Sequence, residues 1–135
     1  VYTPNEIVRF IIESIDYLLQ QQFRKKLASK NIEILDPATG TGTFITELIE
    51  FLPKNKLKYK YKNEIHCNEV AILPYYIANL NIEFTYKQKM GKYEEFEKKS
   101  CLILLFYNNN NNKMASFLKY SLYGNHENLY ILLYM

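Results

Sequence analysis

The stretch from Ile34 to Phe44 contains residues whose types and spacing suit the binding of a small charged ligand. Its apolar start indicates a buried β-strand, Asp36 closes that strand, and Gly40 and Gly42 form a Gly-x-Gly turn before an apolar helix. Glycines let a ligand lie directly against the backbone, and the free N–H groups of a first helical turn attract an anion. The arrangement suits the carboxylate of an amino acid, with Asp36 beside an ammonium group or a bound water.

Two other kinds of nucleotide-binding loop fit these residues less well. A phosphate-binding P-loop requires Lys after its second glycine, and no Lys follows Gly42. A dinucleotide-binding loop requires Gly or Ala three residues past the second glycine, where this chain has Ile45. The sequence therefore favours an amino acid joined to a nucleoside over a pyrophosphate. The alternative is that Gly40 and Gly42 only shape a turn between a strand and a helix.

Glu69 is a second candidate for ligand binding. It follows a predicted second strand, so it is expected at the same sheet edge as Asp36. An acid in this position of a nucleotide-binding α/β fold accepts hydrogen bonds from ribose hydroxyls. The alternative is a solvated acid at the end of a strand.

Alternating helices and strands are predicted to position these residues. Thr3 and Pro4 are typical of a helix start, with Thr3 as the cap. The helix is expected to fade over residues 28–31, and its apolar face is predicted to comprise Ile7, Phe10, Ile11, Ile15, Leu18, Leu19 and Phe23.

The next elements predicted are a strand over 32–35, a helix that ends at Pro53, a strand over 64–68 and a helix over about 70–81. This order predicts an α/β fold with a parallel sheet. The Lys-rich segment 54–62 is expected to be an exposed strand or an extended linker. Its lysines are candidates for contact with DNA phosphates, although such a run is more often a solvated edge.

Composition narrows the class of protein. The chain has 135 residues, enough for one core, and its 48% hydrophobic and 23% charged residues are typical of a folded domain. Cys67 and Cys101 form no Cys-x-x-Cys or His/Cys cluster, so neither a metal site nor a disulfide framework is expected. A cytoplasmic setting is expected instead. The apolar runs are far shorter than the ~20 residues of a membrane span, so no membrane partner is expected.

Three motifs carry a resemblance to a known family. The sequence from Asp36 to Phe44, Asp-Pro-Ala-Thr-Gly-Thr-Gly-Thr-Phe, resembles the cofactor motif of N6-adenine-specific DNA methyltransferases, especially the large type I and type IIG restriction-modification proteins. Tyr2-Thr3-Pro4 resembles the motif that precedes this loop in those proteins, and Asn68-Glu69-Val70 resembles their ribose-binding motif. Together the matches cover about residues 1–95.

The resemblance implies a partial Rossmann-like methyltransferase fold with an N-terminal helix and S-adenosyl-L-methionine as cofactor. It further implies that Glu69 holds the ribose of the cofactor. The residues implied to surround the methionine end of the cofactor are Tyr2, Thr3, Pro4, Asp36, Ala38, Thr39, Gly40 and Gly42. The activity implied is methylation of a flipped adenine in DNA at its exocyclic nitrogen.

The sequence departs from this family in its last third. The catalytic motif of the family, Asn-Pro-Pro-Tyr, is absent, so no catalytic residue is assigned and this chain alone is expected to be inactive. Residues 98–135 diverge from the pattern and include five consecutive asparagines. We therefore expect a cofactor-binding part over 1–97 and a low-complexity tail over 98–135, the product of truncation or a frameshift in a longer gene.

Two alternatives to this interpretation stay open at the level of sequence. One is a methyltransferase that acts on RNA or on protein. The other is a non-catalytic cofactor- or DNA-binding remnant that assembles with the remaining methyltransferase or restriction subunit.

Overall fold

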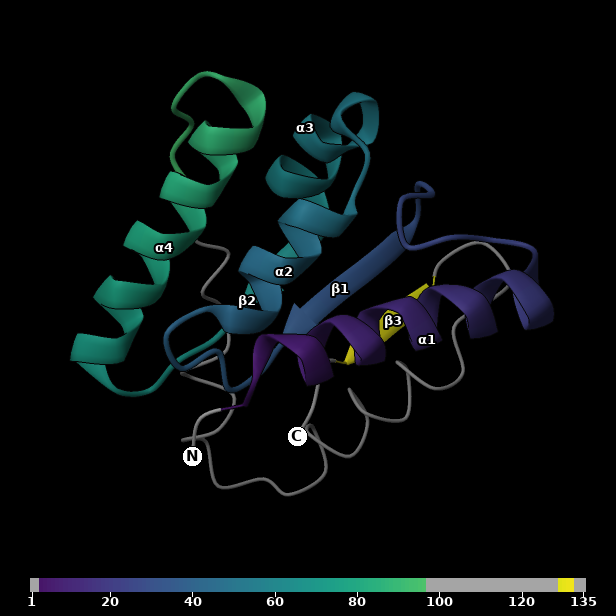
Figure 1. The fold of residues 1–135 in the computed structure, drawn as a ribbon, viewed down its shortest axis with the longest axis horizontal. Helices are drawn as coiled ribbons and strands as arrows, with labels where there is room; N and C mark the ends of the chain where they lie inside the picture. The colour runs from purple at the N-terminus through teal and green to yellow at the C-terminus, as the bar shows by residue number, and fades with distance from the viewer. Residues whose placement is uncertain (1–2, 97–128, 133–135) are drawn as a thin grey trace, which may run out of the picture.

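The computed structural model describes residues 3–96 and 129–132. The described chain contains four helices and three strands, and each strand is preceded by one or two helices, in an order that confirms an α/β fold (Figure 1). In chain order the elements are α1 (Asn5–Phe23), β1 (Ile32–Asp36), α2 (Thr43–Phe51), α3 (Lys54–Asn63), β2 (Ile65–Cys67), α4 (Ile72–Met90) and β3 (Leu129–Leu132).

The three strands form one parallel sheet in the order β2-β1-β3. In register, Ile34 of β1 lies opposite Ile65 of β2 and Ile131 of β3. The parallel pairing of β1 and β2 is as predicted. The strand β3 is not among the predicted elements, because only a partner far away in sequence makes the short segment 129–132 a strand.

The helices α1, α2 and α4 lie side by side, with α2 packed between the other two (Figure 1). Ile32 and Ile34 of β1 are fully buried and share one core with these helices. The central members of this core are Val8, Ile12, Leu27, Ile45, Leu48, Ile49, Leu57, Tyr61, Ile82 and Tyr86. None of the helices in the described ranges 3–96 and 129–132 is both long and apolar enough to cross a membrane.

The apolar face predicted for α1 is largely wrong. The residues that α1 buries are Val8, Ile12 and Leu19, whereas Phe10 is 69% exposed and Leu18 is 52% exposed. Apolar residues occur on more than one side of this helix, so spacing alone does not identify the side that packs against α2 and β1.

Both ends of α1 also differ from the prediction. The helix begins at Asn5 with Pro4 as its N-cap and no side-chain cap hydrogen bond, so Thr3 is not the cap. It ends at Phe23, several residues early, because Arg24 adopts a left-handed conformation and its N–H bonds back to the Gln20 carbonyl.

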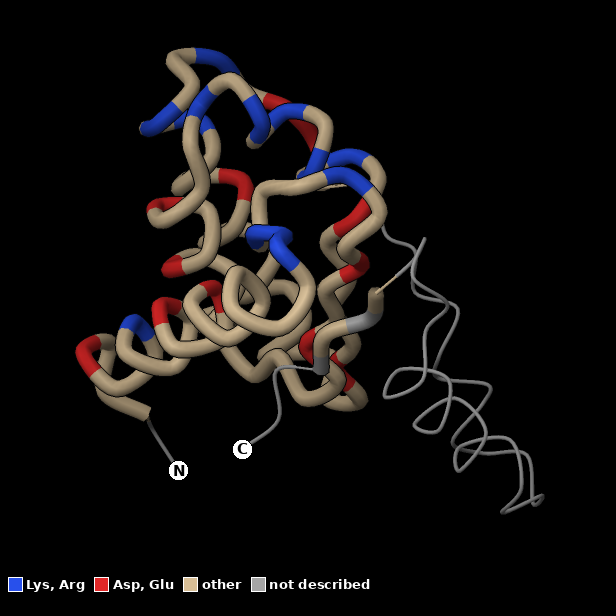
Figure 2. The backbone as a smooth tube through the Cα atoms, turned by 90° about the vertical axis from the view of Figure 1, so that its right-hand side faces the viewer, with Lys and Arg blue, Asp and Glu red and all other residues tan. Residues whose placement is uncertain are grey.

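The Lys-rich segment is the helix α3 rather than a strand or a linker. Leu57 and Tyr61 are buried one helical turn apart, and Lys60 and Glu64 are buried beside them. The lysines that stay exposed on α3 gather with those of the last turn of α4 at the end of the molecule away from the tip of β1 (Figures 1 and 2).

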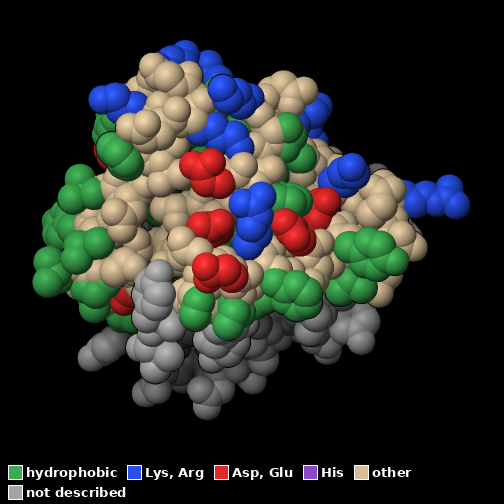
Figure 3. All heavy atoms as spheres, in the orientation of Figure 1, with side chains coloured by type: hydrophobic (Ala, Val, Ile, Leu, Met, Phe, Trp, Pro, Cys, Tyr) green, Lys and Arg blue, Asp and Glu red, His purple; other side chains and the backbone are tan. Residues whose placement is uncertain are grey.

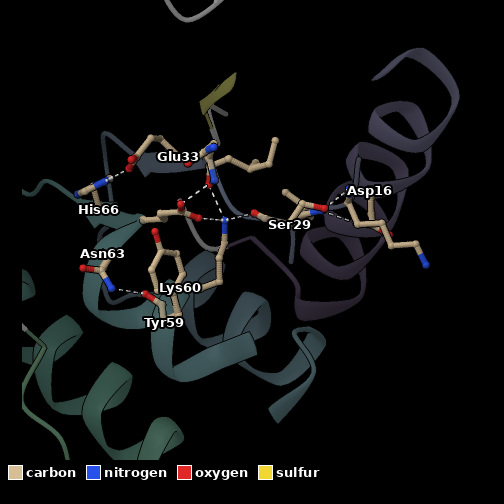
Figure 4. A network of polar contacts seen from close by, with 12 residues as sticks. Asp16, Ser29, Glu33, Tyr59, Lys60, Asn63 and His66 are labelled. Carbon is tan, nitrogen blue, oxygen red and sulfur yellow. Dashed lines mark hydrogen bonds and ion pairs between the residues drawn. The ribbon is translucent and has the colours of Figure 1, made fainter. Parts of the chain in front are cut away.

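Lys60 ties α3 to the start of β1. Its buried ammonium donates to Glu64 Oε2 at 2.6 Å, to the Ile32 carbonyl at 2.5 Å and to the Ser29 carbonyl at 3.1 Å (Figure 4). The other carboxylate oxygen of Glu64 accepts the Asn31 N–H at 2.7 Å. Burial lowers the pKa of Lys60, and Glu64 opposes this shift. The pair thus replaces the hydration that each charge has lost.

Lys89 closes the end of α2 from the last turn of α4. Its ammonium donates to three carbonyls, those of Ile49, Glu50 and Leu52, at 2.5 to 2.7 Å. A cation at a helix C-terminus satisfies carbonyls that lack intrahelical partners and complements the helix dipole.

We expect Lys89→Ala to lower the free energy of unfolding by about 1–2 kcal/mol, since it removes a charge from this terminus. Urea unfolding of the variant measures the loss, with Lys87→Ala, at an exposed position of the same helix, as the control. Equal stability of the two variants would contradict a capping role for Lys89.

Candidate functional site

The candidate site lies where β1 and β2 end. Because the strands are parallel, their carboxyl ends meet at one edge, and backbone hydrogen bonds join the two segments beyond that edge. The Asn68 N–H donates to the Asp36 carbonyl, and the Thr39 N–H donates to the Asn68 carbonyl, each at 2.9 Å. Residues 36–42 therefore form a loop held against residues 68–69.

Glu69 is bound to the Gly-x-Gly turn. Its Oε2 accepts the Gly40 N–H at 2.8 Å, and its Oε1 accepts the Ala71 N–H at 2.9 Å. A carboxylate has about four acceptor positions, so each oxygen of Glu69 keeps capacity for a further donor. The structure thus places Glu69 beside the loop, at the sheet edge where Asp36 also lies.

The two glycines of the loop have different roles. Gly42 has a φ of 91° and lies against α4, where an added Cβ would meet the Ala78 Cα at 3.3 Å. Gly40 has a φ of 57°, and an added Cβ would meet nothing within 4 Å. Both positions favour glycine by backbone conformation. Gly42 also permits close packing, whereas Gly40 leaves open space beside the loop.

Asp36 is a buried acid, 3% exposed, and within the described ranges it forms no ion pair with a basic side chain. Its Oδ1 accepts the Ala38 N–H at 3.2 Å. Burial raises the pKa of Asp36 to about 6, the Ala38 N–H opposes the shift, and the charge of Glu69 adds to it. A buried carboxylate with a raised pKa at a strand end makes Asp36 a candidate functional residue.

We expect Asp36 to make folding less favourable as pH rises. Its pKa is about 6 in the folded protein and 3.8 for an unperturbed aspartate, so the folded protein binds more protons between these values. Asp36→Asn should therefore exceed the wild type in unfolding free energy by roughly 3 kcal/mol at pH 7 and by little near pH 4.

Urea unfolding of both proteins from pH 4 to pH 8 measures this difference. Subtracting the two curves removes the titration of every other group. A difference that stays constant with pH would show that Asp36 ionises normally in the folded protein.

The start of α2 offers free backbone donors. Gly42 is its N-cap with no side-chain cap hydrogen bond, and the first helical bond runs from the Thr46 N–H to the Gly42 carbonyl. The N–H groups of the first turn therefore have no intrahelical partner and lie at the positive end of the helix dipole.

Two further predicted residues lie within the loop, and three lie at the start of the chain. Thr39 is buried with its Oγ1 donating to the Asp36 carbonyl, and Ala38 is exposed. Thr3 is half-buried and Pro4 is exposed at the start of α1, whereas Tyr2 lies outside the described residues. The loop residues and Glu69 are thus brought together, and the role of Tyr2, Thr3 and Pro4 stays a prediction.

Two further residues belong to the site: Asn68 enters the sequence analysis only as part of the Asn68-Glu69-Val70 motif, and Asn81 is not singled out by the sequence. Asn68 is buried, and its Oδ1 has no hydrogen-bond partner among the described residues. Asn81 of α4 donates from Nδ2 to the Thr41 carbonyl at 2.9 Å. The sequence signal for the contact between Asn81 and Thr41 is the helical spacing of Asn81 from Ala78. This signal can be recognised once the extent of α4 is known.

The fold and the site define an α/β domain with a parallel sheet and a glycine-containing loop at the carboxyl ends of its strands. A family model described as N-6 DNA Methylase matches residues 1–100. The chain belongs to the N-6 DNA methylase family.

Individual proteins are similar to this chain over the same region. A type I restriction enzyme methylase subunit, MjaVII of Methanocaldococcus jannaschii, is 32% identical over 87 residues, which is 61% of this chain and 12% of that protein. The matching chain in the structure of a DrdV–DNA complex has 74% sequence identity to this chain and a TM-score of 0.70. The match covers 70% of this chain and 9% of that one.

A further solved structure is that of a nuclease-deletion mutant of the type ISP restriction-modification enzyme LlaGI with a DNA substrate mimic. It is 41% identical with a TM-score of 0.68, and the match covers 71% of this chain and 9% of that one. The chain thus spans about a tenth of the length of the relatives it matches.

Proposed function

We propose that residues 1–97 form the S-adenosyl-L-methionine-binding part of a Rossmann-like methyltransferase domain. The observation that carries this proposal is the loop of residues 36–42, in which a buried acid, two left-handed glycines and a helix start lie beside Glu69. Membership of the N-6 DNA methylase family supports this cofactor. Residues 98–135 are proposed as a divergent tail outside this part.

The residues present fit the cofactor chemically. Asp36 is a buried carboxylate that has no basic ion-pair partner in the described part of the chain, which suits the ammonium of a methionine group. The free N–H groups at the start of α2 suit its carboxylate, and Glu69 has acceptor capacity for ribose hydroxyls. The open space beside Gly40 lets the ligand approach the backbone.

We propose further that the protein to which this domain belongs methylates adenine at N6 in DNA, as part of a restriction-modification system. The family and the DNA complexes of its relatives support this proposal. When bound, S-adenosyl-L-methionine supplies a methyl group on a positively charged sulfur. The loop residues contribute by holding the cofactor in one orientation, since positioning supplies a large share of catalysis in such transfers.

Residues 1–135 are proposed to bind the cofactor without transferring its methyl group. The Asn-Pro-Pro-Tyr sequence that holds adenine in this family does not occur among them. DNA and the remaining parts of a methyltransferase or restriction subunit are therefore its proposed partners.

The test is titration of the chain with S-adenosyl-L-methionine by calorimetry, together with an Asp36→Ala/Gly40→Val double variant. We expect saturable binding by the wild type and no heat above dilution from the double variant. The two proteins are compared by circular dichroism to establish that both are folded. A folded wild type that fails to bind would refute the proposed cofactor function.

A further inference from the structure

The peptide unit between Thr41 and Gly42 is fixed at both of its polar ends. Its carbonyl accepts the Asn81 Nδ2 hydrogen bond at 2.9 Å. Its N–H donates to the Thr39 carbonyl, also at 2.9 Å. A peptide group is planar, so these two bonds together set the orientation of the plane and, with it, the backbone at Gly42.

The face of α4 that carries Asn81 also packs against Gly42. Ala78 precedes Asn81 by three residues, so both side chains lie on one side of the helix. Gly42 packs against Ala78 so closely that a Cβ would lie 3.3 Å from the Ala78 Cα. One helical turn of α4 therefore contacts the loop twice, once by packing and once by a hydrogen bond.

We propose that Asn81 is a positioning residue for the cofactor site, acting by fixing the Thr41–Gly42 peptide. This inference rests on the proposed function. Gly42 is the N-cap of α2, so the orientation of its backbone sets where the free N–H groups of that helix point. A loop without the Asn81 bond samples other peptide orientations, and the ligand must then order it on binding.

The proposal predicts a loss of affinity without a loss of stability. Asn81→Ala removes the hydrogen-bond donor. Alanine has a higher helix propensity than asparagine, so the substitution does not disfavour α4 at this exposed position. We expect the affinity for S-adenosyl-L-methionine to fall about tenfold, the scale of one lost hydrogen bond. The thermal midpoint of unfolding should stay level or rise, whereas replacing a residue that only stabilises the fold would lower it.

Two more variants complete the test. Asn81→Asp keeps the shape and replaces the donor by an acceptor, so it should weaken binding at least as much as Asn81→Ala. Gln88→Ala removes an exposed amide about two turns further along α4 and should leave the affinity unchanged. Wild-type affinity in both Asn81 variants would overturn the proposal.

Amide hydrogen exchange separates this proposal from the proposed function. In the absence of ligand, the Gly42 N–H should exchange several-fold faster in both Asn81 variants than in the wild type and in Gln88→Ala. If the wild type fails to bind the cofactor, the proposed function falls and the exchange rates still decide whether Asn81 fixes the loop. Unchanged Gly42 exchange in both variants would show that it does not.

Discussion

Replacing Lys60 by alanine is expected to lower the free energy of unfolding by about 3–5 kcal/mol, the cost of breaking a buried ion pair from one side. The change leaves Glu64, 2% exposed, without its cationic partner. It also removes the donor for the carbonyls of Ser29 and Ile32, which lie where the chain enters β1. Chemical denaturation with urea measures the loss as a shift of the midpoint.

The control is Lys58→Ala, which removes an exposed lysine from the same helix. It should change stability by less than about 0.5 kcal/mol, as surface substitutions usually do. A Lys60 variant as stable as the Lys58 variant would show that the ammonium does not hold α3 to β1.

Gly40→Val is expected to weaken binding of S-adenosyl-L-methionine about 100-fold, equivalent to roughly 3 kcal/mol of lost contact. The added side chain enters the open space beside the loop, where a Cβ would meet no atom of the described residues within 4 Å apart from those of Gly40 and its chain neighbours. The folded protein should lose only the cost of a left-handed φ for valine, about 1–2 kcal/mol. Calorimetric titration measures the affinity for the cofactor, and urea unfolding of the same preparation measures the free energy of unfolding.

Gly42→Ala provides the contrast to this variant. Its Cβ meets the Ala78 backbone at 3.3 Å, so stability as well as binding should fall. If Gly40→Val binds the cofactor like the wild type, the ligand does not occupy the space beside Gly40.

The strand-loop-helix unit around Asp36 is predictable because its signals are local. An apolar run stopped by an acid and proline, followed by two glycines and an amphipathic helix, specifies a turn without help from distant residues. The end of α2 before Pro53 follows from the same kind of signal.

The helix α3 is not predicted because a lysine-tyrosine alternation resembles a strand pattern. The spacing of Leu57, Tyr61 and Glu64 is nevertheless helical, and these residues are buried together with Lys60. A lysine in such a segment is expected to be solvated, since lysines are almost never fully buried unless paired. The pairing partner, Glu64, lies four residues further on, at the end of the same helix.

Long-range contacts account for the remaining differences. The packing side of α1 depends on α2 and β1, and β3 depends on β1, which lies far earlier in the chain. Local periodicity does not encode such partners. Leu73, Leu80 and Phe84 likewise remain exposed on α4, although their spacing is that of a packed face. Apolar side chains gather at the left edge of the molecule in Figure 3, on the side where Figure 1 shows α4.

The most direct test of the central claim, that the loop of residues 36–42 and Glu69 bind S-adenosyl-L-methionine, is a titration followed by the backbone amide resonances of the isotope-labelled protein. We predict that saturating cofactor shifts the resonances of Gly40, Gly42 and Glu69 and of the first turn of α2, and leaves α3 unchanged. Saturable shifts confined to other parts of the chain, or no shifts in a folded protein, would contradict the claim.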